Sequence, residues 1–186
     1  MLKAGKDPRE VLKEISDIFP FHASVSAEVV GDSVEEMLEM ADDYIEIGPN
    51  ITIKVPLTPE GLKVCKDLST DDVAVNVTLC FSTAQAILAA KAGATYVSPF
   101  VGRVNDQSFD GIKLIEEISD VYATHKQKTQ VLAASIRDVH QVASCFRVGA
   151  DICTIPSKIF SGMYKHILTD QGLKKFDEDW SKLVGG

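Results

Sequence analysis

Short runs rich in valine, isoleucine and alanine alternate with longer amphipathic stretches, and this rhythm is the feature that most restricts the fold. The runs predict buried strands at residues 23–30, 50–56, 73–79, 94–100, 130–136 and 150–156. They recur at intervals of roughly 20–35 residues, the spacing of strands joined by crossover helices in a parallel sheet. The pattern therefore predicts an α/β protein, either an open doubly wound sheet or a (β/α)8 barrel.

Apolar residues at helical spacing predict the helices between these strands. The first helix is expected at about 7–18, later ones within 33–47, 82–94, 111–125 and 138–150, and a C-terminal helix at about 170–184. Ser82 and Asp138 are suitable N-caps, and Gly93 and Gly149 mark helix ends. No GxGxxG or GxxxxGK[ST] motif follows a predicted strand, so the usual nucleotide signals are missing. We expect one domain spanning 1–186.

Charge and cysteine content exclude several classes of function. The 186 residues carry a formal net charge of −8, which argues against a nucleic-acid or anionic-membrane partner. No apolar run approaches the ~20 residues of a membrane span, and the N-terminus lacks the apolar core of a signal peptide. The cysteines are widely spaced, as expected of reduced thiols in a cytoplasmic protein rather than of disulfides. They are Cys65, Cys80, Cys145 and Cys153.

We expect neither a metal nor another cofactor, because the histidines show no ligand-like spacing. They are His22, His125, His140 and His166.

Polar residues interrupt the apolar strands in their second halves or just after them. In a barrel, the carboxyl ends of the strands carry the active-site groups, so this bias predicts a site at that edge. The residues concerned are Glu28, Lys54, Asn76, Thr78, Ser98, Ser135 and Arg137.

Lys54 is the most informative of them. If Ile51, Ile53 and Val55 face the helices, then Thr52 and Lys54 point into the barrel, because strand side chains alternate. Burial lowers the pKa of an ammonium group, and a neutral amine attacks carbonyl carbon to form a Schiff base. The alternative is an edge strand on which Lys54 is merely solvated.

Glu28 and Thr78 each have a structural and a functional reading. A carboxylate in a strand is more often a solvated edge residue, but beside a barrel lysine Glu28 could place a water and move protons. Thr78 is β-branched, so strand propensity alone explains it.

Two arginines follow separate strands. Arg103 and Arg137, with Ser135 two residues before Arg137 on the same side of its predicted strand, would form a phosphate clamp. The alternative is two surface arginines near helix N-termini.

Several long motifs together carry a family likeness. The segments ITIKVPLTPEGL, NVTLCFSTAQAILAAKAGATYVSPFVGR, VLAASIRD and KFDEDW resemble the transaldolases, in particular the short subfamily that includes fructose-6-phosphate aldolase. The likeness runs from residue 1 to about residue 182.

The resemblance implies a (β/α)8 barrel of the class I aldolase type that works without a metal. It implies transfer of a dihydroxyacetone unit between sugar phosphates in the pentose phosphate pathway, in a homo-oligomeric protein, typically a pentamer or decamer. Lys54 matches the Schiff-base lysine, and Glu28 and Thr78 match the pair that holds the catalytic water. Asn76 and Ser98 match residues that bind substrate hydroxyls.

The remaining matches concern the phosphate and the type of reaction. Arg103, Ser135 and Arg137 match the family's phosphate-binding group. Aldolases of this subfamily carry glutamine at the position of Glu28 and tyrosine at that of Phe100, so the resemblance favours transaldolase. A phenol can donate a proton where a phenyl ring cannot.

The likeness departs from the family at the start of the chain. We expect the family's first two strands and first helix, close to one βαβ unit, to be missing here, and with them an acid–base aspartate and a substrate-binding asparagine. The strands at 23–30 and 150–156 would then be open edges. We expect a shortened chain to show weak catalytic turnover and to self-associate. The alternative that is not an enzyme is a fragment that only binds sugar phosphate.

Overall fold

The computed structural model describes residues 7–19 and 23–185. Within these ranges the chain forms a six-stranded parallel sheet in the order β1-β2-β3-β4-β5-β6. The strands are β1 (Val25–Glu28), β2 (Ile51–Pro56), β3 (Val75–Cys80), β4 (Tyr96–Pro99), β5 (Gln130–Ala133) and β6 (Ile152–Cys153). All six predicted strands are confirmed, although each is shorter than its apolar run. His22 lies outside the described residues.

Nine helices accompany these strands in the described part of the chain. They are α1 (Pro8–Ile18), α2 (Val34–Ile45), α3 (Pro59–Thr70), α4 (Thr83–Lys91), α5 (Val101–Asp106), α6 (Gly111–Thr124), α7 (Val139–Arg147), α8 (Ser157–Gly162) and α9 (Ile167–Val184). The predicted caps are confirmed, since the Ser82 and Asp138 side chains accept hydrogen bonds from the first turns of α4 and α7. Gly93 and Gly149, just past these helices, have φ angles of 93° and 101° that favour glycine.

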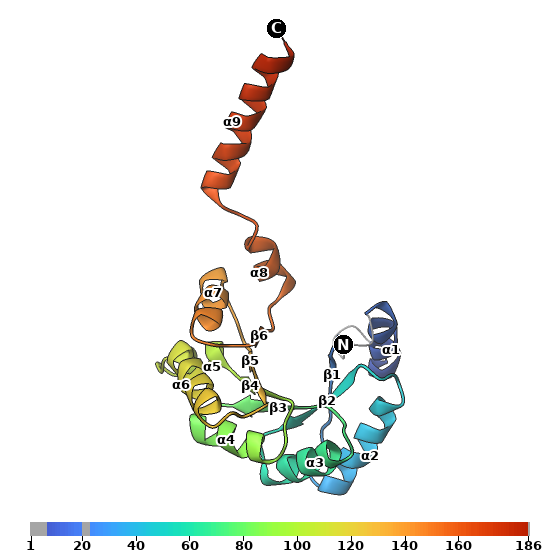
Figure 1. Ribbon diagram of the computed structural model, residues 1–186. Helices are drawn as coiled ribbons and strands as arrows, with labels where there is room; N and C mark the ends of the chain where they lie inside the picture. The colour runs from blue at the N-terminus through green and yellow to red at the C-terminus, as the bar shows by residue number, and fades with distance from the viewer. Residues whose placement is uncertain (1–6, 20–22, 186) are drawn as a thin grey trace.

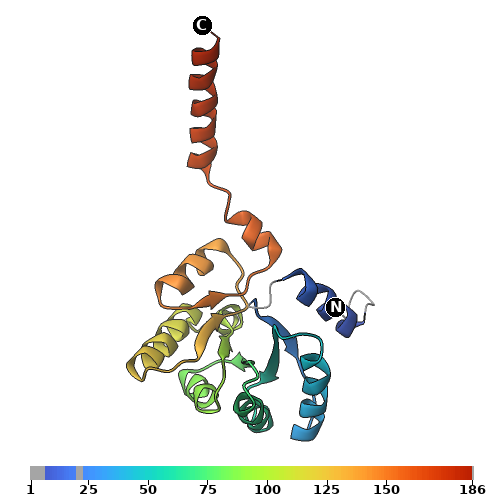
Figure 2. The same ribbon diagram turned by 45° about the vertical axis from the view of Figure 1, so that its right-hand side comes forward.

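The sheet curls like part of a barrel, with α2, α3, α4, α6 and α7 around its convex side (Figures 1 and 2). Because strands repeat every two residues, one row of side chains faces these helices and the other faces the concave side. Ile53 and Val55 are fully buried in the core shared with Val64 of α3 and Met37 of α2. This places Thr52 and Lys54 on the concave face, as predicted.

The two edges of the sheet are β1 and β6, as expected from the sequence. In the described residues β1 pairs with β2 alone and β6 with β5 alone. The predicted barrel is therefore incomplete in the described residues, which form a curled, open sheet of six strands.

The C-terminal helix α9 projects away from the sheet (Figures 1 and 2). It begins at Ile167, three residues before the predicted start, and none of its residues is buried. The described residues contain no helix that is both long and apolar enough to cross a membrane.

Candidate active site

The concave face carries polar side chains that form two separate hydrogen-bonded groups. The Ser98 hydroxyl donates to Asn76 Oδ1 at 2.7 Å, and Asn76 Nδ2 donates to Ser26 Oγ at 3.3 Å. Ser24 and Thr52 share a hydrogen bond of 2.7 Å. The Ser98–Asn76 bond joins paired strands, and the Asn76–Ser26 bond crosses β2, so these side chains of β1, β3 and β4 lie on one face of the sheet.

Lys54 and Glu28 meet on this face. Parallel pairing puts Glu28 of β1 opposite Lys54 of β2, and Lys54 Nζ lies 2.8 Å from Glu28 Oε2. Lys54 does not lie on an edge strand, because β2 pairs on both sides; the solvated-edge alternative for Lys54 is therefore wrong. The expectation of a dry pocket is met in part, since the Lys54 side chain is 24% exposed.

Both interpretations of Glu28, as a solvated edge residue and as a partner of the lysine, hold in the structure. It stands on an edge strand and its side chain is 46% exposed, yet it holds an ion pair with Lys54. A carboxylate within hydrogen-bond reach of an amine can accept its proton.

On β3, Asn76 is the residue that pairs with Lys54, and Thr78 lies two residues further along the same strand. Its side chain is fully buried, and among the described residues its hydroxyl has no hydrogen-bond partner. Buried polar groups are almost always satisfied. An unpartnered hydroxyl on β3, the strand that pairs with the strand of Lys54, is therefore not explained by strand propensity alone.

The backbone is strained at two points of this edge. Leu79 and Ser135 have φ angles of 59° and 58°, and Leu79 lies where the pairing of β3 with β4 shifts register. Left-handed conformations of bulky residues cost of order 1–3 kcal/mol and cluster at functional sites. Asp72, Ser108 and Lys126, the other such residues among those described, lie just after helices.

The structure corrects one argument about Ser135. Strand β5 ends at Ala133, and Ser135 adopts the left-handed conformation. Strand alternation therefore does not place Ser135 and Arg137 on one side; a loop brings them to the same edge.

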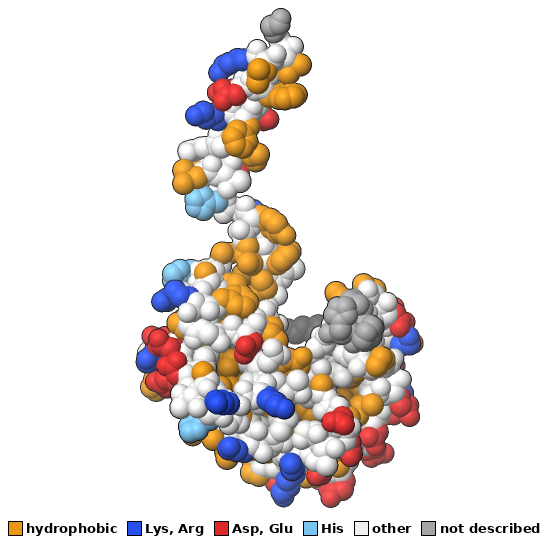
Figure 3. Space-filling model, viewed as in Figure 1, with side chains coloured by type: hydrophobic (Ala, Val, Ile, Leu, Met, Phe, Trp, Pro, Cys, Tyr) orange, Lys and Arg blue, Asp and Glu red, His pale blue; other side chains and the backbone are white. Residues whose placement is uncertain are grey.

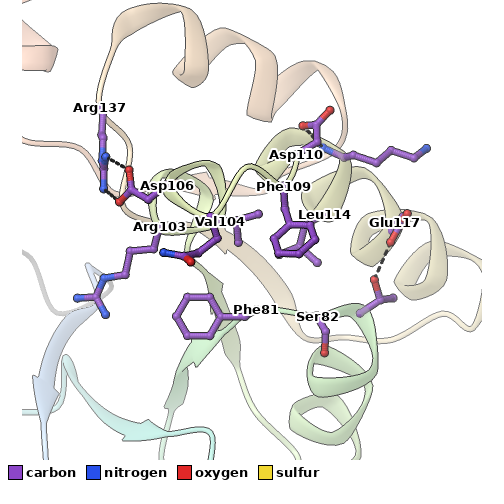
Figure 4. A pocket seen from close by; sticks show the side chains of 13 residues that line it. Phe81, Ser82, Arg103, Val104, Asp106, Phe109, Asp110, Leu114, Glu117 and Arg137 are labelled. Carbon is purple, nitrogen blue, oxygen red and sulfur yellow. Dashed lines mark hydrogen bonds and ion pairs between the residues drawn. The ribbon is translucent and has the colours of Figure 1, made fainter.

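Arg103 and Arg137 border one cleft of about 830 Å³ beside the carboxyl ends of β3 to β5 (Figure 4). The Arg103 guanidinium lies 4.8 Å from the centre of the Phe100 ring, which packs edge-on against Phe81 at 5.7 Å. Lys54, however, is not among the lining residues. The predicted site thus spans two adjoining regions, a polar concave face and an arginine-bordered cleft.

Arg137 is not a free guanidinium in this structure. Its two terminal nitrogens donate to the two carboxylate oxygens of Asp106, as the dashed lines in Figure 4 show. These hydrogen bonds hold the pKa of Asp106 below its usual range, and the charge of Arg103 adds to this effect. Asp106 is not among the residues predicted from the sequence, although it follows Arg103 by one helical turn of α5.

Ser26 is a second residue that the sequence analysis missed. Ser26 lies two residues before Glu28 on the same strand, so strand alternation places both side chains on the concave face and could have identified it. No cluster of three or more metal-ligating side chains occurs in the part of the chain that the structure describes.

The sequence profile described as "Transaldolase/Fructose-6-phosphate aldolase" matches residues 8–186. The chain belongs to this family. A protein of Paracoccus denitrificans (strain Pd 1222) named "Probable transaldolase" is 51% identical over 182 residues, which cover 98% of this chain and 83% of the relative. A protein of the same name from Caulobacter vibrioides (strain NA1000 / CB15N) is 46% identical over 179 residues, covering 96% and 82%.

Members of this family are barrel enzymes, and the curled parallel sheet fits that architecture. Family membership supports a transaldolase-type enzyme that acts on sugar phosphates.

Proposed function

We propose that this chain is a transaldolase that moves a dihydroxyacetone unit between sugar phosphates through a Schiff base on Lys54. The observation that carries the proposal is the Lys54–Glu28 pair at 2.8 Å on a polar concave face. The names of the relatives support the same reaction.

In the proposed reaction, Glu28 accepts a proton from the Lys54 ammonium, and the free amine attacks the ketone carbon of a substrate such as fructose 6-phosphate. Loss of water gives a protonated imine. When water leaves, Glu28 returns to its carboxylate form and takes the proton of the C4 hydroxyl. The C3–C4 bond then breaks, its electron pair moves toward the imine to form an enamine, and an aldose phosphate leaves as the aldehyde. The enamine attacks the aldehyde carbon of a second aldose phosphate, whose oxygen takes back the proton held by Glu28. Water finally hydrolyses the imine and frees Lys54. No metal takes part in these steps.

Glu28 and Thr78 are proposed to hold the water that forms and hydrolyses the imine. The unpartnered Thr78 hydroxyl supports this role, because such a water would satisfy it. Asn76 and Ser98 are proposed to bind substrate hydroxyls, and their mutual hydrogen bond would keep both side chains oriented.

Arg103, Ser135 and Arg137 are proposed to bind the substrate phosphate. Guanidinium groups match phosphate oxygens in charge and geometry. Arg103 and Arg137 line the cleft, and Ser135 lies on the same loop as Arg137.

The second candidate function is fructose-6-phosphate aldolase, in which free dihydroxyacetone is released. Phe100 favours transaldolase, because its ring packs between Arg103 and Phe81 and offers no hydroxyl to protonate the enamine. The third candidate is a fragment that binds sugar phosphate without turnover.

Borohydride trapping separates these functions. Incubation with fructose 6-phosphate and borohydride should add a sugar-derived mass to the peptide that contains Lys54, and Lys54→Arg should abolish the adduct. Lys66→Arg, at an exposed position of α3, is the matched control. A binder would show affinity without an adduct, and trapping at another lysine would refute the mechanism. Release of free dihydroxyacetone in the absence of an acceptor would identify an aldolase.

We further propose a homo-oligomer, a pentamer or decamer, in which α9 packs on a second copy of this chain. Exposed apolar residues line α8 and α9 (Figure 3), among them Phe160, Leu173, Phe176, Trp180 and Leu183. Soluble monomers rarely expose such a continuous apolar surface. Trp180→Glu should lower the mass measured by light scattering, whereas Lys175→Glu on the same helix should not; an unchanged mass for Trp180→Glu would refute the interface.

A cytoplasmic location is proposed from cysteine usage. All four cysteines are free thiols in the structure, as is usual in a reducing compartment.

A further inference from the structure

Arg137 and Asp106 form a two-pronged ion pair across α5 and the loop after β5. Both terminal nitrogens of Arg137 donate to the Asp106 carboxylate (Figure 4). The two side chains are 51% and 45% exposed, and ion pairs this exposed contribute little to stability. The pair therefore needs an explanation other than holding the fold together.

The Nε edge of the Arg137 guanidinium, which shares one nitrogen with the terminal edge, lies on the side of Gly102 and Ser135. A Cβ atom built on Gly102 would lie 2.2 Å from the Ser135 carbonyl oxygen, 2.7 Å from Arg137 Nε and 2.9 Å from Ser135 Oγ, so the Nε edge and the hydroxyl both lie against this glycine. The Gly102 N–H also donates to the Ser135 carbonyl at 3.1 Å, which fixes α5 against this loop. Any side chain at position 102 would collide with the Ser135 backbone and displace Arg137 and the Ser135 hydroxyl.

An arginine can bind an oxyanion in a two-pronged manner through its terminal edge or through its Nε edge. Asp106 occupies the terminal edge, so the Nε edge beside Ser135 is the one left for a ligand. Without Asp106, Arg137 would be free to rotate about its long side chain, and ordering it on binding would cost conformational entropy.

We propose that Asp106 is a positioning residue for phosphate recognition: it clamps the terminal edge of Arg137 and thereby presents the Nε edge, with Ser135, to the substrate phosphate. This inference rests on the proposed function, in which Arg137 and Ser135 bind that phosphate. Under this inference Asp106 strengthens phosphate binding in spite of its negative charge, because its orientation of Arg137 outweighs the repulsion between carboxylate and phosphate.

The test compares Asp106→Asn with the unaltered protein. Asparagine keeps the shape but removes the charge and one acceptor. The KM for a phosphorylated aldose acceptor should rise about fivefold to tenfold, with kcat within about twofold. With an unphosphorylated aldehyde as acceptor, kcat/KM should not change. Asp106→Glu, which keeps the charge, should recover part of the loss.

A second measurement does not depend on catalysis. Titration of inorganic phosphate, followed by phosphorus NMR, should show weaker binding to Asp106→Asn than to the unaltered protein. Asp43→Asn is the matched control, because Asp43 pairs with Arg9 at 3.1 Å on the exposed surface of α1 and α2 and its loss changes the net charge equally.

Two results would overturn the proposal. One is phosphate binding by Asp106→Asn that equals or exceeds that of the unaltered protein, including the case in which neither binds. The other is an equal loss of activity with the unphosphorylated acceptor. Failure of the proposed function is distinguishable, because it would appear as the absence of borohydride trapping at Lys54 while phosphate binding still depends on Asp106.

Discussion

Replacement of Thr78 by valine should make the protein more stable and less active. The Thr78 side chain is fully buried, and its hydroxyl has no hydrogen-bond partner in the described residues. An unsatisfied buried hydroxyl costs roughly 1–3 kcal/mol, and valine has nearly the same shape without the polar atom. We therefore expect Thr78→Val to raise the free energy of unfolding by about 1 kcal/mol, a rise in Tm of about 2–4 °C.

Thr129→Val is the matched control with the opposite sign. Thr129 is also buried, but its hydroxyl donates to the Ala94 carbonyl at 2.7 Å. Valine would leave that carbonyl unpaired, so Thr129→Val should lower the free energy of unfolding by about 1–2 kcal/mol. Urea unfolding followed by circular dichroism measures both changes.

The activity of the two variants completes the comparison. Thr78→Val should reduce kcat by about tenfold to a hundredfold, because the proposed water is held there only while the imine forms and is hydrolysed, and it would then lose one hydrogen bond. Thr129→Val should leave kcat close to its original value. If Thr78→Val destabilised the protein as much as Thr129→Val does, the hydroxyl must be satisfied in solution; if it left kcat unchanged, Thr78 would have no role in catalysis.

Two further predictions concern stability. A Cβ on Gly61 would lie 2.0 Å from the Pro56 carbonyl oxygen, so Gly61→Ala should lower the free energy of unfolding by about 3 kcal/mol or more. Gly172→Ala in the exposed helix α9, where a Cβ would meet nothing within 4 Å, should leave the free energy of unfolding unchanged or raise it. Urea unfolding measures both. Burial raises the pKa of the Cys65 and Cys80 thiols from 9.0 to about 12. Unfolding therefore releases protons above pH 9, and the free energy of unfolding should fall from pH 9 to 12 by up to about 1.4 kcal/mol per pH unit for each thiol; replacing both with alanine should flatten this slope, and an unchanged slope would refute the assignment.

The local sequence determined the elements and the faces of the strands. Ser82 and Asp138 cap their helices as expected, and the alternation in 51–56 placed Lys54 on the face opposite Ile53 and Val55. These features depend on side-chain periodicity and on hydrogen bonds within a few residues, which the sequence displays directly.

Contacts between distant segments could not be derived in the same way. The Lys54–Glu28 ion pair depends on the register of β1 against β2, and the Arg137–Asp106 pair joins residues 31 positions apart on a loop and a short helix. The left-handed conformation of Ser135, which lies in the loop between β5 and Arg137, is also visible only in the tertiary structure.

The sequence by itself therefore determined which residues are chemically capable and which side of each strand they occupy. Tertiary structure decided which of them meet, because register, loop path and the partner of each charge follow from packing over the whole sheet. Thr78 illustrates both levels: its residue type suited any strand, and the surrounding packing left its hydroxyl without a partner.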